Sequence, residues 1–153
     1  MAFSRAALKL EPECGPIEPV SFHRQIEPIM KNRCLACHLK EKKGPQKMGY
    51  ADLREYAFYF AGGFGRSTMQ KEQGGSRTMP GRFGAAASRL GQALLTERHR
   101  AAVPEDERHR VILWLDANAP QYGSFHDLAA QERGELVWPL LDVDPANPLA
   151  NVE

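Results

Sequence analysis

The chain has 153 residues, of which 42% are hydrophobic and 25% charged, as is ordinary for one globular domain with a modest core. Its formal net charge of +1 gives no global basic field, so composition does not indicate a nucleic-acid partner. No run of about 18 apolar residues occurs, so we expect no transmembrane segment. The 13 Gly and 11 Pro predict long loops.

The first half of the chain contains two predicted helices. Residues 1–20 are rich in Pro and Glu and have no clear period, so we expect an extended arm. Ser21 can cap a helix that runs toward Cys34. One face of that helix is apolar, with residues at helical spacing: Ile26, Ile29, Met30 and Cys34. Pro28 interrupts the pattern, so the regular helix is expected to begin only there.

Loops separate this helix from the others. Residues 39–49 form a charged loop with Gly and Pro, and a short helix is expected over 50–60. Residues 62–84 are dense in Gly and polar side chains, which predicts an irregular segment. Loops of that length in compact domains tend to be functional.

The second half again predicts helices. Residues 85–97 read as one helix with three inward-facing leucines: Leu90, Leu94 and Leu95. Pro104 and three acids open a helix that ends near Asn118, with Val111, Trp114 and Leu115 on its apolar face. A weaker helix covers 126–135, and a Pro-rich extended tail follows. Without convincing strands or repeats, the fold class is mainly α, with long Gly/Pro-rich loops and extended termini.

The chemistry centres on the segment Cys34-Leu35-Ala36-Cys37-His38, a C-x-x-C-H motif. One helical turn places the two sulfurs at the spacing of the haem vinyl groups, which they join as thioethers. His38 then lies beneath the iron as its proximal ligand. The motif therefore predicts one covalent haem c and a cytochrome c-like domain.

Two other chemistries are possible for a C-x-x-C pair. A structural zinc site needs four ligands, and beyond the motif only Cys14 and scattered histidines are available. A thioredoxin-type redox pair needs a preceding strand, and none is predicted. Cys14 is expected to be a spare thiol in the arm.

The sixth iron ligand decides what the haem can do, because a second side chain favours electron transfer and an open position permits binding or catalysis. The candidates are His23, His99, His109, His126, Met30, Met48, Met69 and Met79. His99 follows a leucine-rich helix and begins a short loop that could reach over a haem. Met79 precedes Pro80-Gly81 in a loop, as distal methionines of small cytochromes often do.

Several blocks resemble the terminal haem domain of hydrazine synthase alpha-subunit-like proteins. The matching blocks span about residues 21–123: SFHRQIEPIMKNRCLACH, ADLR, GGFG, SRTMPGRFGAAASRL and H…PEDERHRVILWLDANAPQYG. The resemblance implies a helical cytochrome domain with bis-histidine haem, whose distal histidine precedes the Pro-Glu-Asp helix, here His99. The propeller domain, second haem and hydrazine-forming site of that family are not carried over.

We therefore expect an arm (1–20), a haem domain (21–123) and a C-terminal helix with a Pro-rich tail (124–153). The expected function is single-electron transfer by a monohaem cytochrome, rather than enzyme activity of its own, with a redox partner or a larger cytochrome assembly. Alternatives are a catalytic or small-ligand-binding haem with an open distal site, or a structural haem subunit. Because haem is attached to such motifs outside the cytoplasm, we expect a periplasmic or otherwise exported protein, although residues 1–20 lack a signal peptide's apolar run.

Overall fold

The computed structural model describes residues 18–57 and 84–139, and these residues are mainly helical without any strand. This confirms the predicted α class. No helix in these two ranges is long and apolar enough to cross a bilayer. The predictions for Cys14, Met69, Met79 and the Pro-rich tail fall outside the described residues.

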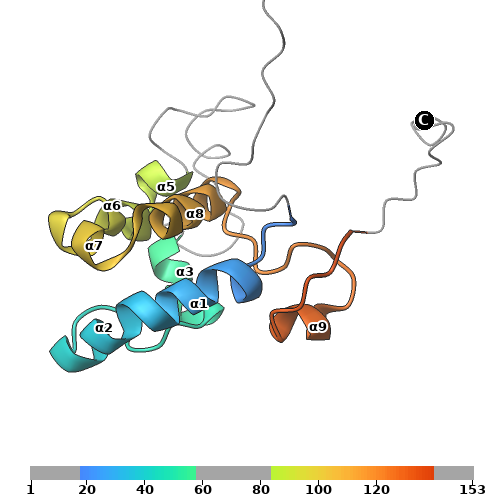
Figure 1. Cartoon of the computed structure of the whole chain (residues 1–153), viewed down its shortest axis with the longest axis horizontal. Coiled ribbons are helices and arrows are strands. Elements are labelled where there is room, and N and C mark those ends of the chain that lie inside the picture. The colour runs from blue at the N-terminus through green and yellow to red at the C-terminus, as the bar shows by residue number, and fades with distance from the viewer. Residues whose placement is uncertain (1–17, 58–83, 140–153) are drawn as a thin grey trace, which may run out of the picture.

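The first layer is one continuous helical rod (Figure 1). It consists of η1 (Phe22–Ile26), α1 (Glu27–Ile29), η2 (Met30–Cys34) and α2 (Leu35–Glu41). The rod begins at Phe22, and its regular α-helical part begins at Glu27 with Pro28 in the first turn, within one residue of the expected start. The first turn is π-helical, and its wider geometry leads into Pro28, which has no amide hydrogen to donate.

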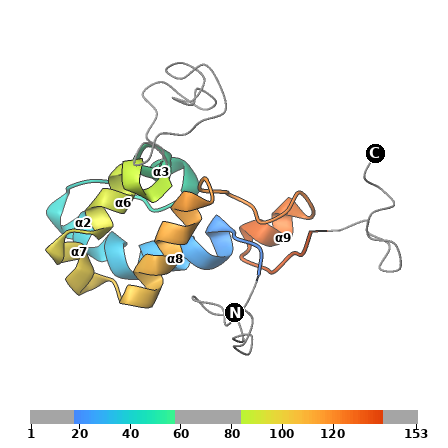
Figure 2. The same cartoon turned by 90° about the horizontal axis from the view of Figure 1, so that it is seen from above.

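The second layer packs across this rod. It contains α5 (Gly84–Ala87), α6 (Arg89–Leu94), α7 (Glu97–Ala102) and α8 (Glu105–Asp116), and α3 (Tyr50–Ala57) lies beside α6. The view in Figure 2 places α7 next to α2 at one end and α9 (Leu128–Glu132) at the other, where it contacts η1. The helices expected over 50–60, from Pro104 to near Asn118 and over 126–135 are thus present. α8 and α9 are shorter than predicted, and α3 is described as far as Ala57.

The helix expected over 85–97 is broken at Ser88. This residue is extended (φ −81°, ψ 144°) and fully buried, and its hydroxyl accepts a hydrogen bond from the Gly91 amide at 2.8 Å. Ser88 therefore acts as the N-cap of a new helix, α6. Gly91 is required in its first turn, because a Cβ there would lie 2.0 Å from the Ala85 carbonyl oxygen.

The break also changes which leucines face inward. Leu94 is buried and Leu90 partly so, as expected, but Leu95 is 56% exposed, so its predicted burial is wrong. Leu95 is the C-cap of α6, where the chain turns toward α7 and no longer follows the helical period.

The two layers share a core around Trp114 of α8. Its ring centroid lies 5.6 Å from that of Phe22, whose ring also contacts Tyr50 edge-on. The predicted apolar faces are confirmed, since Ile26, Met30, Val111 and Leu115 are all buried. This core fixes the relative position of the rod and α8, and hence of the connection that precedes α8.

The Ser88 cap generates a stability prediction. Ser88→Ala leaves the Gly91 amide without its acceptor in a buried position and should lower the free energy of unfolding by about 1–2 kcal/mol. Urea unfolding of the full chain measures this. The control Gln92→Ala changes an exposed residue of the same helix and should cost less than about 0.5 kcal/mol. Equal effects of the two variants would contradict the capping role.

Candidate functional site

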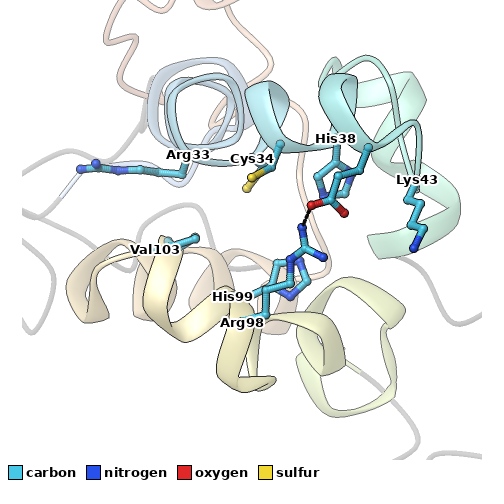
Figure 3. A pocket seen from close by; sticks show the side chains of 11 residues that line it. Arg33, Cys34, His38, Lys43, Arg98, His99 and Val103 are labelled. Carbon is cyan, nitrogen blue, oxygen red and sulfur yellow. Dashed lines mark hydrogen bonds and ion pairs between the residues drawn. The ribbon is translucent and has the colours of Figure 1, made fainter.

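Three reactive side chains of the rod share one face at its C-terminal end. Cys34 and His38 are four residues apart and Cys37 lies between them at i+3, so helical geometry groups them. Cys34 is buried and Cys37 exposed, and no disulfide joins them. Figure 3 shows Cys34 and His38 directed toward the second layer.

The loop after α2 packs closely against the His38 ring. Lys42 ends α2 in the left-handed region, and Gly44 follows with φ +69°. A Cβ on Gly44 would lie 2.9 Å from both Nδ1 and Cε1 of His38, so only glycine fits. His38 Nδ1 is buried there and finds no hydrogen-bond partner among the described residues. Gly44 was not among the predicted site residues, although a Gly-Pro pair soon after the motif signals a tight turn.

The opposite wall of the site is the short helix α7. It contributes His99, Arg98 and Ala102, and the buried Val103 follows directly. His99 therefore lies on a helix, and the expectation that it begins a loop is wrong. Thr96 is the N-cap of this helix and Val103 its C-cap, so its six residues connect α6 to α8.

His38 and His99 face each other across the gap between the layers (Figure 3), and their ring centroids are 6.4 Å apart. An imidazole nitrogen binds a metal ion at about 2.0 Å and the ring centroid lies about 1.1 Å behind it, so two imidazoles on opposite sides of one ion have centroids about 6.2 Å apart. The observed spacing therefore suits one metal ion held between the two rings.

Burial favours the neutral, ligand-competent form of His99. Its pKa is lowered by burial first, then by the nearby His38 and Arg98, while the Ala93 carbonyl opposes the shift. A histidine must be deprotonated to ligate a metal, so this direction suits the role. Burial also raises the pKa of the Cys34 thiol, as do the nearby Cys37 and Glu107.

These residues line a cavity of about 160 Å³ whose rim is charged. Arg98 of α7 pairs with Glu41 of α2 across the rim, and Arg33 forms a two-pronged ion pair with Glu107 of α8, both bonds at 2.8 Å. Each pair ties one layer to the other. The sequence alone did not single out Arg33 or Glu41, because their partners are distant in the chain.

The other candidate ligands in the described ranges lie elsewhere. Met30 and Met48 are buried in the core. His23 pairs with Glu27 at 3.1 Å near the start of the rod. His109 lies on α8 and His126 precedes α9, and neither lines the cavity. Of the described candidates, only His99 shares the cavity with His38.

The described residues contain no group of three or more His, Cys, Asp and Glu side chains arranged to hold a metal ion. A tetrahedral zinc site would need further ligands from other parts of the chain. Two facing imidazoles instead suit a cofactor that brings its remaining metal ligands with it.

Comparisons with known proteins find no matching family model, no matching curated protein and no matching solved structure.

The contact between Gly44 and His38 can be tested with a matched pair of glycines. Gly44→Ala and Gly134→Ala both place a side chain at positive φ, and this backbone strain alone should cost each about 1–2 kcal/mol of unfolding free energy. Only at Gly44 would the new Cβ meet His38, because at Gly134 the nearest atom is 3.6 Å away. Proton NMR of the full chain should show shifted His38 ring resonances in Gly44→Ala alone. Unchanged resonances in that variant would contradict the packing described.

Proposed function

We propose that this chain is a monohaem c-type cytochrome that transfers single electrons. One haem c would be attached through Cys34 and Cys37 and ligated by His38 on one side and His99 on the other. The observation that carries the proposal is the 6.4 Å separation of the two imidazole centroids on opposite walls of the same cavity.

The chemistry of the residues supports a haem more than a bare metal ion. The motif supplies two thiols and one imidazole on a single helix face, and the second layer supplies one further imidazole. The buried, unpartnered Nδ1 of His38 marks a polar ring fixed in place by packing. The cavity is smaller than a tetrapyrrole, and the Arg98 and Glu41 side chains that cross its rim are 58% and 36% exposed, so they can swing outward.

A bound haem supplies a one-electron iron couple, and this chain supplies its axial ligands and surroundings. With His99 in place, no position is left for a substrate, which favours electron transfer over catalysis. Two imidazoles give a lower potential than a His/Met pair, because a thioether ligand raises it. The exposed Cys37 side of the site would let electrons leave toward a partner.

The cationic side chains at the rim suit the two carboxylates of a haem. Arg33, Lys43 and Arg98 line the cavity, and a guanidinium can bind a carboxylate through two parallel hydrogen bonds. Both arginines already hold a carboxylate in this structure. A haem propionate could exchange with Glu41 or Glu107.

The location, assembly and family of the protein are part of the same proposal. C-type haem is attached outside the cytoplasm, so the chain would be periplasmic or otherwise exported, as a subunit or domain of a larger redox assembly. The relationship to the haem domain of hydrazine synthase alpha-subunit-like proteins is likewise proposed. It rests on the sequence blocks described above and on the position of His99 before α8.

Covalent attachment is tested by intact mass. Full-length protein matured in a host competent for cytochrome c assembly should carry one haem that survives acid extraction. Cys34→Ser and Cys37→Ser should each lose one thioether, because each thiol bonds one vinyl group, and the double variant should lose all covalent haem. Cys14→Ser is the matched control and should keep the full mass. Apoprotein or a zinc adduct from such a host would overturn the proposal.

The distal ligand is tested by substitution. His99→Ala should leave the iron without its sixth ligand and give a high-spin spectrum with carbon monoxide binding. His126→Ala removes a histidine outside the cavity and should keep the low-spin spectrum. If His99→Ala leaves the spectrum and potential unchanged while Met79→Ala alters both, the ligand pair is His/Met.

A further inference from the structure

Thr96 occupies the N-cap position of α7 but does not cap the helix. An N-cap threonine normally accepts a hydrogen bond from a backbone amide two or three residues later, which stabilises the first turn. Thr96 has the extended backbone of a cap (φ −70°, ψ 148°), yet its side chain makes no such bond. Its hydroxyl lies instead 2.8 Å from the Nδ1 atom of the His99 ring, three residues later.

The direction of this hydrogen bond follows from the other bond of the same hydroxyl. Thr96 Oγ1 donates to the Ala93 carbonyl oxygen at 2.7 Å. A hydroxyl has one proton, so toward His99 it can only accept. His99 Nδ1 must therefore carry the proton, and Nε2 keeps its lone pair.

We propose that Thr96 is a positioning residue that fixes the tautomer and rotation of His99 and so strengthens it as the distal haem ligand. This inference rests on the proposed function. An acceptor on Nδ1–H holds the ring and makes the other nitrogen a better donor, as outer partners of metal-bound histidines generally do. The Thr96 hydroxyl makes this contact in place of the usual helix-capping bond.

The two facing histidines differ in this respect. His38 is held by steric contact with Gly44, and its Nδ1 finds no acceptor in the described part of the chain. His99 is held by a directed hydrogen bond. The loss of Thr96 should therefore act on one axial ligand only.

The test compares Thr96→Val, which keeps the shape and removes the acceptor, with Thr96→Ser, which restores a hydroxyl. Both are made in the haem-loaded full chain. Carbon monoxide can bind the reduced protein only when His99 leaves, so its apparent affinity reports the strength of the distal bond. Loss of an outer hydrogen-bond partner weakens metal ligation about 10- to 100-fold. Water can reach this exposed site and replace part of the lost bond, so we expect the lower end of that range. Thr96→Val should therefore bind carbon monoxide with about tenfold higher apparent affinity than wild type. Thr96→Ser should return to within about twofold of wild type.

Two controls separate this role from a structural one. In a His99→Ala background, Thr96→Val should leave carbon monoxide affinity unchanged, because the bond it supports is already gone. Ser88→Ala, which removes a true helix cap, should lower stability without changing that affinity.

The outcomes distinguish the two proposals. If wild type carries haem and His99→Ala opens the iron, but Thr96→Val and wild type bind carbon monoxide equally, the role of Thr96 is refuted and the cytochrome proposal stands. An equal effect of Thr96→Val in the His99→Ala background would also refute it. If His99→Ala does not open the iron, the ligand assignment itself is wrong.

Discussion

The site depends on two imidazole rings from different layers, which are held at a spacing that suits one metal ion between them. His38 comes from the rod and His99 from α7, 61 residues later in the chain, so no local structure brings them together. Their separation is set by the core beneath them, where Trp114 packs on Phe22 and Val103 is buried at the end of α7. Close packing makes such a core resist small displacements. The ion pairs Arg33–Glu107 and Arg98–Glu41 join the same two layers at the surface, where they add little to stability.

Holding two histidines this close has a free-energy cost, and the two rings differ in how far their surroundings relieve it. Burial, with the nearby His38 and Arg98, lowers the pKa of His99 and so favours its neutral form. Its Nδ1 proton is bound by Thr96. His38 carries the larger penalty, since a buried polar atom without a partner costs about 1–3 kcal/mol. This nitrogen lies against Gly44, so a metal between the rings would bind the other ring nitrogen of His38.

Much of this arrangement was predictable from sequence, and the reasons for the rest are specific. The spacing of Cys34, Cys37 and His38 defines a helix face by itself, and the period of Val111 and Leu115 predicts the buried side of α8. The break at Ser88 was not predictable, because serine is also tolerated inside helices and only the close approach of the Ala85 carbonyl to Gly91 reveals the new cap. The pairing of His38 with His99 required the tertiary fold, as did the contact between His38 and Gly44. The resemblance pointed to His99, and the geometry gives that choice an independent physical basis.

The central claim is that one iron lies between two histidines, and the spectrum of the wild-type protein tests it most directly. Full-length protein matured with haem should be examined by visible and near-infrared absorption and by electron paramagnetic resonance, in both redox states. The account predicts a low-spin spectrum with two imidazole ligands, no methionine band at the red edge of the visible, and no shift at a carbon monoxide concentration that just saturates His99→Ala. A high-spin spectrum or a methionine band would contradict it.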